Sequence, residues 1–416
     1  MKMDKNLHIP QGYRQTEVGV IPDDWEVVRL GKIGNFIGGG TPSTKIKEYW
    51  NGSIPWVSSS DLTEENIYQI HKHRFITDSA IGKSATKKVP KNSVLIVSRV
   101  GVGKVAINKD IICTSQDFQS LIPGNNNCIF LAYLIKDKAK LLASYNQGTS
   151  IKGFVSSDLK NLQIPLPPKQ EQQKIADILT TWDNAINQQT TLIEKKQQLK
   201  KGLMQQLLTA KTRFSEFSDD WKIEKLKDVF NFKKGSGLSK GKIVSSGDFD
   251  CVLYGELYTI YNEIITTIKS KTNAKEGFLS QYDDILIPAS TTTSAIDLAI
   301  ASVIKKDDVL LGGDINILRN IYNNICGDFF SHYLTYIKKN EIAKYAQGIT
   351  IIHLYAKDFG KIEVHLPSVK EQQKIAQVLI LADNEITKLQ TELALLKTQK
   401  KGLMQQLLTG KTRVKF

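Results

Sequence analysis

Five loops rich in glycine and hydroxyl residues are the parts of the sequence best suited to contact a ligand. They read GGGTPS (38–43), VSSSD (57–61), SRVGVGK (98–104), KKGSG (233–237) and ASTTTS (289–294). Glycine lets a backbone approach a phosphate, Ser and Thr donate hydrogen bonds to phosphates, and Arg, Lys, Asn and Gln read base edges. Ordinary surface turns have a similar composition, so loop chemistry alone leaves both interpretations open.

The candidate DNA contacts come from these loops and from polar positions near them, in both halves of the chain. In the first half we single out Thr41, Ser43, Ser59, Ser60, Arg99, Lys104, Gln147, Thr149 and Lys152. In the second half they are Lys234, Ser236, Tyr254, Glu256, Thr291, Thr292, Gln347 and Thr350.

Nucleotide-binding and methyltransferase motifs are incomplete in this sequence. The loop at 98–104 has Gly101 and Gly103 but lacks the third glycine at dinucleotide spacing, and the Gly-Lys-Ser at 82–84 lacks the earlier glycine of a phosphate loop. The Asn-Pro-Pro-aromatic signature of adenine methyltransferases is absent. A turn at a strand end explains the glycines better than a cofactor does.

Nuclease and metal chemistry are supported no better. Asp158 and Lys160 could form half of a nuclease site, but no matching upstream acid is evident. His71 and His73 alternate as on one strand face, without a third ligand nearby in sequence, so we interpret them as surface or DNA-facing side chains. We therefore expect no catalytic residues, no bound metal and no cofactor.

Composition favours a basic, globular, multidomain protein. The 416 residues carry a formal net charge of +14 and are 41% hydrophobic. A length prior gives two to three domains, and the charge favours a polyanionic partner such as nucleic acid, although codon bias could supply part of the lysine excess. No signal-peptide-like or membrane-spanning stretch occurs, and the four cysteines are scattered. We expect a cytoplasmic protein with reduced thiols.

The sequence repeats itself at a shift of two hundred residues. KKGLMQQLLTAKTRF (200–214) and KKGLMQQLLTGKTRV (400–414) differ at two of fifteen positions, and LPPKQEQQKIADIL (166–179) matches LPSVKEQQKIAQVL (366–379). A fainter match pairs DDWEVVRLGKIGNF (23–36) with DDWKIEKLKDVFNF (219–232). Between these anchors the halves diverge, so variable and shared blocks alternate along the chain.

The shared blocks have the apolar spacing of long helices. In the first block the apolar positions are Ile178, Trp182, Ala185, Leu192, Leu199, Leu203 and Leu207, and the second block repeats the pattern. Ser368 and Glu371 predict a capping box, and Gly410 predicts a helix end. A helix of about 40 residues, or about 60 Å, needs a partner along its length. The other copy is the obvious partner, with packing on a globular core as the alternative.

The variable blocks have strand-like runs such as SVLIV (93–97) and DILIP (284–288) between turn signals. The expected fold class is therefore α+β, with two globular domains separated by two long antiparallel coiled-coil helices in a pseudo-two-fold repeat. The expected boundaries are 13–165 and 217–366 for the globular domains, and 166–212 and 367–412 for the helical blocks.

The shared blocks, and the motifs VIPDDWEVVRLGKIG, YWNGSIPWVSSSDL, FKKGSGLSK and CVLYGELYTIYNEII in the variable blocks, resemble type I restriction-modification specificity subunits. The resemblance implies two target-recognition domains that each read half of a bipartite site in double-stranded DNA. It also implies that methyltransferase subunits dock on the long helices and that restriction motor-nuclease subunits join them. The second block lacks the IPWV of the first, which fits two different recognition domains.

Two other classes of function fit the sequence less well. An enzyme would need a convergent set of acid, base or nucleophile, and none is recognisable. A free-standing DNA-binding regulator would share the charge and the two-domain plan, but no helix-turn-helix pattern stands out, and the long helices offer more apolar surface than one seam needs. We expect a non-catalytic DNA-recognition subunit with no membrane partner.

Overall fold

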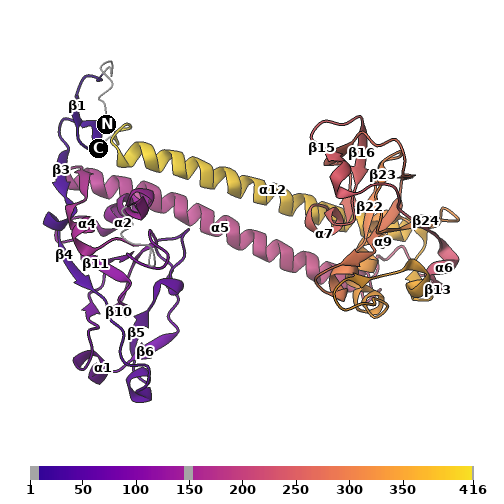
Figure 1. Ribbon diagram of the computed structural model, residues 1–416, viewed down its shortest axis with the longest axis horizontal. Coiled ribbons are helices and arrows are strands. Elements are labelled where there is room, and N and C mark those ends of the chain that lie inside the picture. The colour runs from indigo at the N-terminus through magenta and orange to yellow at the C-terminus, as the bar shows by residue number, and fades with distance from the viewer. Residues whose placement is uncertain (1–8, 145–152, 415–416) are drawn as a thin grey trace. The chain divides into compact units, whose positions relative to one another are not determined.

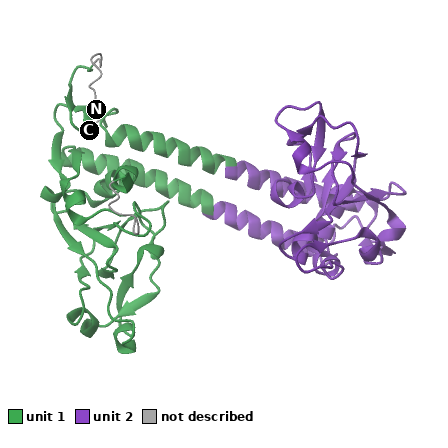
Figure 2. Ribbon diagram, viewed as in Figure 1, with its two compact units in different colours: residues 1–190, 391–416 green, residues 191–390 purple. Residues whose placement is uncertain are grey.

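The computed structural model describes residues 9–144 and 153–414. The chain divides into two compact units, the first formed by residues 1–190 and 391–416 and the second by residues 191–390 (Figure 2). Helices α5 (Lys169–Leu207, 39 residues) and α12 (Val369–Leu408, 40 residues) each contribute to both units (Figure 1). Both helices have the length that the shared blocks predicted. No helix within the described residues is both long and apolar enough to cross a membrane.

Unit 1 is built on two four-stranded sheets. One has the order β4-β11-β8-β9, with the bounds Asn35–Gly38, Phe118–Ile122, Val94–Val97 and Val105–Ile107. The other has the order β6-β5-β10-β7, with the bounds Arg74–Ile76, Ile54–Val57, Ile112–Thr114 and Lys88–Val89. Strand β8 confirms the strand predicted from SVLIV, and the structure buries it along its whole length.

Smaller elements complete unit 1. Two-stranded sheets pair β1 with β2 and β3 with β12, with the bounds Tyr13–Thr16, Gly19–Pro22, Glu26–Arg29 and Gln163–Leu166. The short helices are α1 (Asp78–Gly82), α2 (Cys128–Asp137), α3 (Ala139–Ser144) and α4 (Ser156–Asn161), with 3-10 turns η1 (Leu30–Lys32), η2 (Lys47–Trp50) and η3 (Ser59–Asp61).

Unit 2 contains two five-stranded sheets. The order β14-β24-β20-β22-β17 has the bounds Phe230–Lys234, Ile315–Asn320, Asp284–Pro288, Ser302–Ile304 and Ile264–Ile265. The order β15-β18-β16-β23-β19 has the bounds Ile243–Val244, Ser270–Thr272, Phe249–Val252, Leu310–Leu311 and Phe278–Leu279. Strand β20 confirms the strand predicted from DILIP.

The remaining elements of unit 2 are short. Two-stranded sheets pair β13 with β26 and β21 with β25, with the bounds Lys222–Lys225, Glu363–Leu366, Ser290–Thr291 and Ile352–His353. The helices are α6 (Leu226–Val229), α7 (Glu256–Thr259), α8 (Ala295–Leu298), α9 (Gly327–Tyr336), α10 (Lys339–Ala343) and α11 (Ala356–Phe359), with the 3-10 turn η4 (Lys240–Lys242).

Within each unit, parts of α5 and α12 lie side by side and run antiparallel (Figure 2). In unit 1, Asp183 of α5 binds Lys400 of α12, and farther along α5 Gln189 donates a hydrogen bond to Glu392, which comes earlier in α12. In unit 2, Lys196 binds Glu385 at 2.7 Å. Residue numbers rise along one helix as they fall along the other, which defines the antiparallel direction.

A buried glutamate marks the start of each long helix. Glu171 accepts hydrogen bonds from Arg413 at 2.9 and 3.0 Å and from the indole of Trp25 at 2.9 Å. Because its carboxylate is fully buried, these charge-assisted bonds replace the water it has lost. The strand β3 region and the C-terminal segment are thereby tied to the beginning of α5.

Unit 2 repeats this arrangement two hundred residues later. Glu371 accepts hydrogen bonds from Arg213 at 2.9 and 2.8 Å and from Trp221 at 3.2 Å. Ser368 does cap the helix, accepting from the backbone N–H of Glu371 at 3.4 Å. The predicted capping box is nevertheless wrong in its second half, because the Glu371 carboxylate binds Arg213 and Trp221 instead of turning back to its own helix.

A second repeated contact joins the two long helices to the globular part of each unit. In unit 1, Asp183 accepts hydrogen bonds from Lys400 and from the hydroxyl of Tyr133 on α2. In unit 2, Asp383 binds Lys200 at 2.6 Å and lies 3.5 Å from the Nε2 atom of His332 on α9. Burial and the charge of Asp183 raise the pKa of Tyr133, so its hydroxyl stays protonated as a donor.

The ends of the long helices and their apolar positions agree with the sequence prediction only in part. Gly410 has a φ of 70° and ends α12 as predicted, while Ala210 takes the same left-handed conformation, with a φ of 56°. A Cβ at Gly410 would lie 2.4 Å from Pro22 Cδ, so glycine is required there. Leu192 and Leu199, which the apolar pattern placed in the shared stripe, are 39% and 56% exposed.

We predict that Asp183→Asn weakens unit 1 by about 3 kcal/mol, because it leaves the charge of Lys400 unpaired. The two side chains are only 6% and 12% exposed, so water cannot compensate. The matched control is Glu385→Gln, whose carboxylate is 50% exposed and whose partner Lys196 is 32% exposed, so its loss should cost about 1 kcal/mol or less. Hydrogen exchange, followed separately in the two units during denaturant titration, measures the loss of unfolding free energy in each variant. Equal losses for the two variants would contradict the prediction.

Candidate nucleic-acid interface

Four segments far apart in the sequence meet at one edge of the unit 1 sheets. These segments, 38–43, 57–61, 98–104 and 114–117, are named loop cluster 1. Backbone hydrogen bonds connect Gly40 with Thr114 (2.8 Å), Ser115 with Val57 (2.8 Å) and Ser98 with Asp117 (2.7 Å). Pairing of β4 with β11, of β11 with β8 and of β5 with β10 brings these strand ends together.

Glycine in the GGGTPS loop serves the close approach of the chain to itself. A Cβ at Gly39 would lie 1.9 Å from the carbonyl oxygen of Ser115, and one at Gly40 would lie 2.5 Å from the backbone of Ala85 and Thr86. These glycines therefore let the loop lie against the backbone of Ser115, Ala85 and Thr86, and the side chains of Thr41 and Ser43 after them are exposed.

The predicted residues of loop cluster 1 fall into exposed and inward-facing groups. Thr41, Ser43, Ser60 and Arg99 are exposed, and Thr41 donates a hydrogen bond to Gln116. Lys104 is half-buried and donates to the carbonyl oxygen of Ser59 at 3.2 Å, which ties two of the loops together.

Ser59 itself is 8% exposed, which speaks against direct contact of its side chain with DNA. Its backbone, rather than its hydroxyl, shapes the loop through Lys104. Gln147, Thr149 and Lys152 lie outside the described residues.

Arg74 and Asp61 belong to this edge but were missed in the sequence. Arg74 binds Asp61 and donates to Ser58 at 2.7 Å, and its guanidinium lies 4.6 Å from the centre of the Trp56 ring. Asp61 also accepts from the backbone of Ser58 at 2.7 Å, so this buried carboxylate fixes the VSSSD loop. No local sequence pattern marks Arg74, because its hydrogen-bonding partners lie 13 and 16 residues earlier, in the VSSSD loop.

Unit 2 has a similar gathering of loops, named loop cluster 2 and formed by 233–237, 252–256, 289–294, 311–314 and 347–354. Asp314 is central to it, because it lies 3.6 Å from Lys234 and accepts from Ser290 at 3.1 Å. Backbone bonds also join Ser236 to Leu311 at 3.1 Å. As in unit 1, a glycine allows close contact: a Cβ at Gly235 would lie 2.0 Å from the Gly312 carbonyl oxygen.

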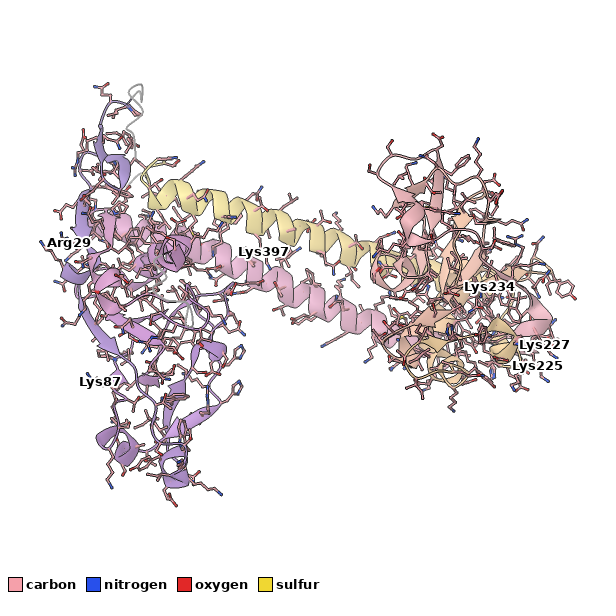
Figure 3. The ribbon with its side chains drawn as sticks, in the orientation of Figure 1. Arg29, Lys87, Lys225, Lys227, Lys234 and Lys397 are labelled. Carbon is pink, nitrogen blue, oxygen red and sulfur yellow. The ribbon has the colours of Figure 1, made fainter. Side chains whose placement is uncertain are left out.

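Most predicted residues of loop cluster 2 face solvent. Lys234, Ser236, Thr292, Gln347 and Thr350 are exposed, and Tyr254 is half-buried, with its ring 6.3 Å from that of Tyr258. Figure 3 shows Lys234 with two further exposed lysines of unit 2, Lys225 and Lys227, and labels Arg29 and Lys87 in unit 1.

Two predicted residues of this cluster are buried and have structural partners. Glu256 is 8% exposed and accepts from the backbone of Leu253 at 2.6 Å and from the hydroxyl of Ser270. Thr291 is 3% exposed, lies in β21 and accepts from the backbone of Thr293 at 3.2 Å. These contacts speak against both side chains as direct DNA contacts in this conformation.

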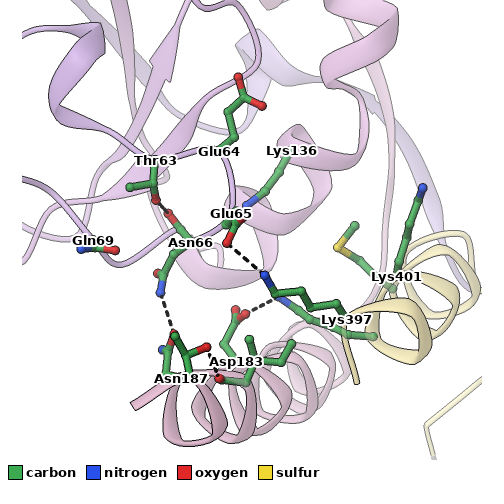
Figure 4. Close-up of a pocket in the computed structure, with 14 residues that line it drawn as sticks. Thr63, Glu64, Glu65, Asn66, Gln69, Lys136, Asp183, Asn187, Lys397 and Lys401 are labelled. Atoms are coloured by element: carbon green, nitrogen blue, oxygen red, sulfur yellow. Dashed lines mark hydrogen bonds and ion pairs between the residues drawn. The ribbon is translucent and has the colours of Figure 1, made fainter. Parts of the chain in front are cut away.

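A separate cleft of about 650 Å³ lies in unit 1, between the 63–69 segment and the two long helices (Figure 4). Ion pairs of Lys397 with Glu65 (3.2 Å) and of Lys400 with Asp183 cross it. Burial, followed by repulsion from Lys400, lowers the pKa of Lys136 to about 8. This cleft is lined by other residues than loop cluster 1, so it is not part of the candidate interface.

This chain is similar to known proteins in both sequence and fold. The type I restriction modification DNA specificity domain matches it twice, over residues 22–200 and 218–397. A type I restriction enzyme MjaIX specificity subunit from Methanocaldococcus jannaschii is 28% identical, covering 97% of this chain and 96% of that subunit. The EcoR124I/EcoR124II specificity subunit of Escherichia coli is 35% identical over 172 residues, 39% of this chain and 42% of that subunit.

Solved structures give the same fold. The crystal structure of a type I restriction-modification S subunit from M. genitalium has a TM-score of 0.59 at 19% identity, covering 97% of this chain and 98% of that one. Two specificity-domain matches that together span most of the sequence decide the family. The chain belongs to the type I restriction-modification DNA specificity family and carries two copies of its specificity domain.

Proposed function

We propose that this chain is the DNA-recognition subunit of a type I restriction-modification complex and that it reads a bipartite target in double-stranded DNA. One observation carries the proposal. Each of the two units has one exposed loop cluster, and the contacts that the units share recur two hundred residues apart in the sequence. Two domains with the same internal contacts but different loops are suited to recognise two different half-sites. The formal charge of +14 suits a phosphate-rich partner.

The domain assignment is part of the proposal. Residues 13–165 and 217–366 act as the two target-recognition domains, and 166–212 and 367–412 are the helical blocks that connect them. The antiparallel ion pairs within each unit support an antiparallel coiled coil, and the matching Glu171 and Glu371 contacts support a pseudo-two-fold repeat.

Among the candidate residues, the exposed ones are proposed to contact DNA. They are Thr41, Ser43, Ser60, Arg99, Lys234, Ser236, Thr292, Gln347 and Thr350, with the half-buried Lys104 and Tyr254 beside them. Gln147, Thr149 and Lys152 remain proposed contacts on their chemistry alone.

The long helices are proposed to hold the methyltransferase subunits, which the restriction subunits then join. Leu199, Leu381 and Leu395 on these helices are 56%, 61% and 57% exposed, which leaves apolar side chains available to a partner. Methyl transfer and cleavage are assigned to those partners, and this chain chooses the sequence. A free-standing regulator would not need this apolar surface.

Exchanging residues 13–165 for the corresponding block of a relative should change one half-site and leave the other intact, because each loop cluster is built within one unit. The measurement is methylome mapping by long-read sequencing in cells that express the chain with its methyltransferase neighbour. The reciprocal exchange of residues 217–366 is the control. Changes in both half-sites after either exchange would rule out independent readers.

Gly39→Ala should distort loop cluster 1 and relax recognition of one half-site, because the new Cβ would lie 1.9 Å from the Ser115 carbonyl oxygen. Overpacking of this kind costs about 1–3 kcal/mol. Gly82→Ala is the matched control, since nothing lies within 4 Å of a Cβ there. The discrimination between the target and DNAs that differ from it by one base is measured by competition binding. Equal discrimination by the Gly39→Ala and Gly82→Ala proteins would refute the role of Gly39.

Lys234→Ala should reduce the slope of log affinity against log salt by about 1 without changing the preferred bases, as expected for one lost phosphate contact. Lys234 is 58% exposed and only loosely paired with Asp314. Lys227→Ala, at an exposed lysine of α6 outside loop cluster 2, should leave the slope unchanged. An unchanged slope for Lys234→Ala would remove it from the interface.

A further inference from the structure

Unit 2 gathers three side chains of metal-binding chemistry beside the long helices. Glu263 precedes β17, His332 lies on α9 and Asp383 lies on α12. One ligand atom from each can be chosen so that all lie within 4.8 Å of one another. Because the three residues come from separate elements, an ion bound among them would fasten the helix to the globular part.

The orientation of His332 favours a cation at this point. The imidazole is fully buried, and its Nδ1 atom lies 2.7 Å from the carbonyl oxygen of Asp328. A carbonyl oxygen only accepts hydrogen bonds, so Nδ1 carries the proton. In the neutral ring Nε2 then presents its lone pair toward Asp383, 3.5 Å away. The lone pair and the negatively charged carboxylate repel each other, and a cation bound between them would attract both.

The two carboxylates also have supporting partners, as the imidazole has in the carbonyl oxygen of Asp328. The hydroxyl of Tyr336 donates to Oε1 of Glu263, and Lys200 binds Oδ1 of Asp383 at 2.6 Å. Each carboxylate therefore keeps a second oxygen for another ligand. Metal-binding histidines and carboxylates are commonly held by outer partners of this kind, which fix the tautomer and the direction of the lone pairs.

The equivalent position of unit 1 has different chemistry. The backbone N–H groups of Asn127 and Cys326 make the same bond, to Gln172 and Gln372, which places Tyr133 where unit 2 has His332. Tyr133 donates a hydrogen bond to Asp183 and, because its pKa is raised, stays protonated and offers no ligand at neutral pH. In unit 1 the aspartate on the long helix is therefore bound by a tyrosine hydroxyl, whereas in unit 2 the equivalent Asp383 faces an imidazole and a second carboxylate, that of Glu263.

We propose that Glu263, His332 and Asp383 bind one divalent transition-metal ion such as Zn²⁺, through Nε2 of the imidazole and one oxygen of each carboxylate. Mixed nitrogen and oxygen donors suit this class of ion, and water would complete its coordination. The ion would have a structural role, joining α12 to α9 and to the segment before β17. No catalytic role follows from it.

The test uses the full-length chain after treatment with a chelator. Calorimetric titration with Zn²⁺ and absorption of bound Co²⁺ should both give one ion per chain, and the Tm of unit 2 should rise with the metal. His332→Gln and Glu263→Gln should abolish that binding. Tyr336→Phe, which keeps all three ligands, should weaken it roughly 10- to 100-fold by removing the support of Glu263.

Two controls separate this site from others. Tyr133→Phe, at the equivalent position of unit 1, should leave metal affinity unchanged. The double variant His71→Ala/His73→Ala should also bind one ion, although these exposed rings stack 5.9 Å apart and could capture metal adventitiously. Circular dichroism confirms that each variant is folded.

Three results would overturn the proposal. One is the absence of stoichiometric Zn²⁺ binding by the wild-type chain at neutral pH, which would mean that a proton on Nε2 fills the gap. Another is unchanged affinity in folded His332→Gln and Glu263→Gln. The third is loss of the bound ion only in His71→Ala/His73→Ala, which would assign it to those surface histidines.

Discussion

The fold depends on a carboxylate buried at the start of each long helix. Glu171 and Glu371 are removed from water and would be unfavourable in the core without the Arg and Trp donors that reach them from distant segments. The same bond fixes the register of a helix about 40 residues long and closes the globular part beside it. Because the donors and acceptors recur two hundred residues apart, this one constraint accounts for the Trp, Glu and Arg that the two halves share at these positions.

The variable sequence is free to differ because it is not part of that constraint. Loop clusters 1 and 2 rest on strand pairing and on glycines that approach the backbone closely, as Gly39 and Gly235 do. Side chains beyond those glycines face solvent and can change without loss of a core contact. A scaffold of this kind can present different reading surfaces while its helices stay the same, which is what a specificity subunit requires.

The long helices, strands β8 and β20 and the end of α12 at Gly410 could be predicted from the sequence, because each depends on a local pattern of spacing or conformation. The loop clusters could be predicted only as loops, since their meeting depends on pairing between strands such as β4 and β11. The same limit explains Glu256: its polarity indicated a contact, but only the fold shows Leu253 and Ser270 as its partners. For Glu371, a competing long-range partner, Arg213, replaced the predicted local one.

Unit 1 is assembled from the two ends of the chain, and this has a consequence for the order of events during synthesis. Unit 2 is one continuous segment, whereas residues 1–190 must wait for residues 391–416. At about 5–20 residues per second, the ribosome needs roughly 10–40 s to make the intervening segment. Throughout that interval Glu171 lacks Arg413, and the apolar surface that Leu407 and Leu408 will cover stays open. The half of the protein that is translated first is therefore the half that is completed last.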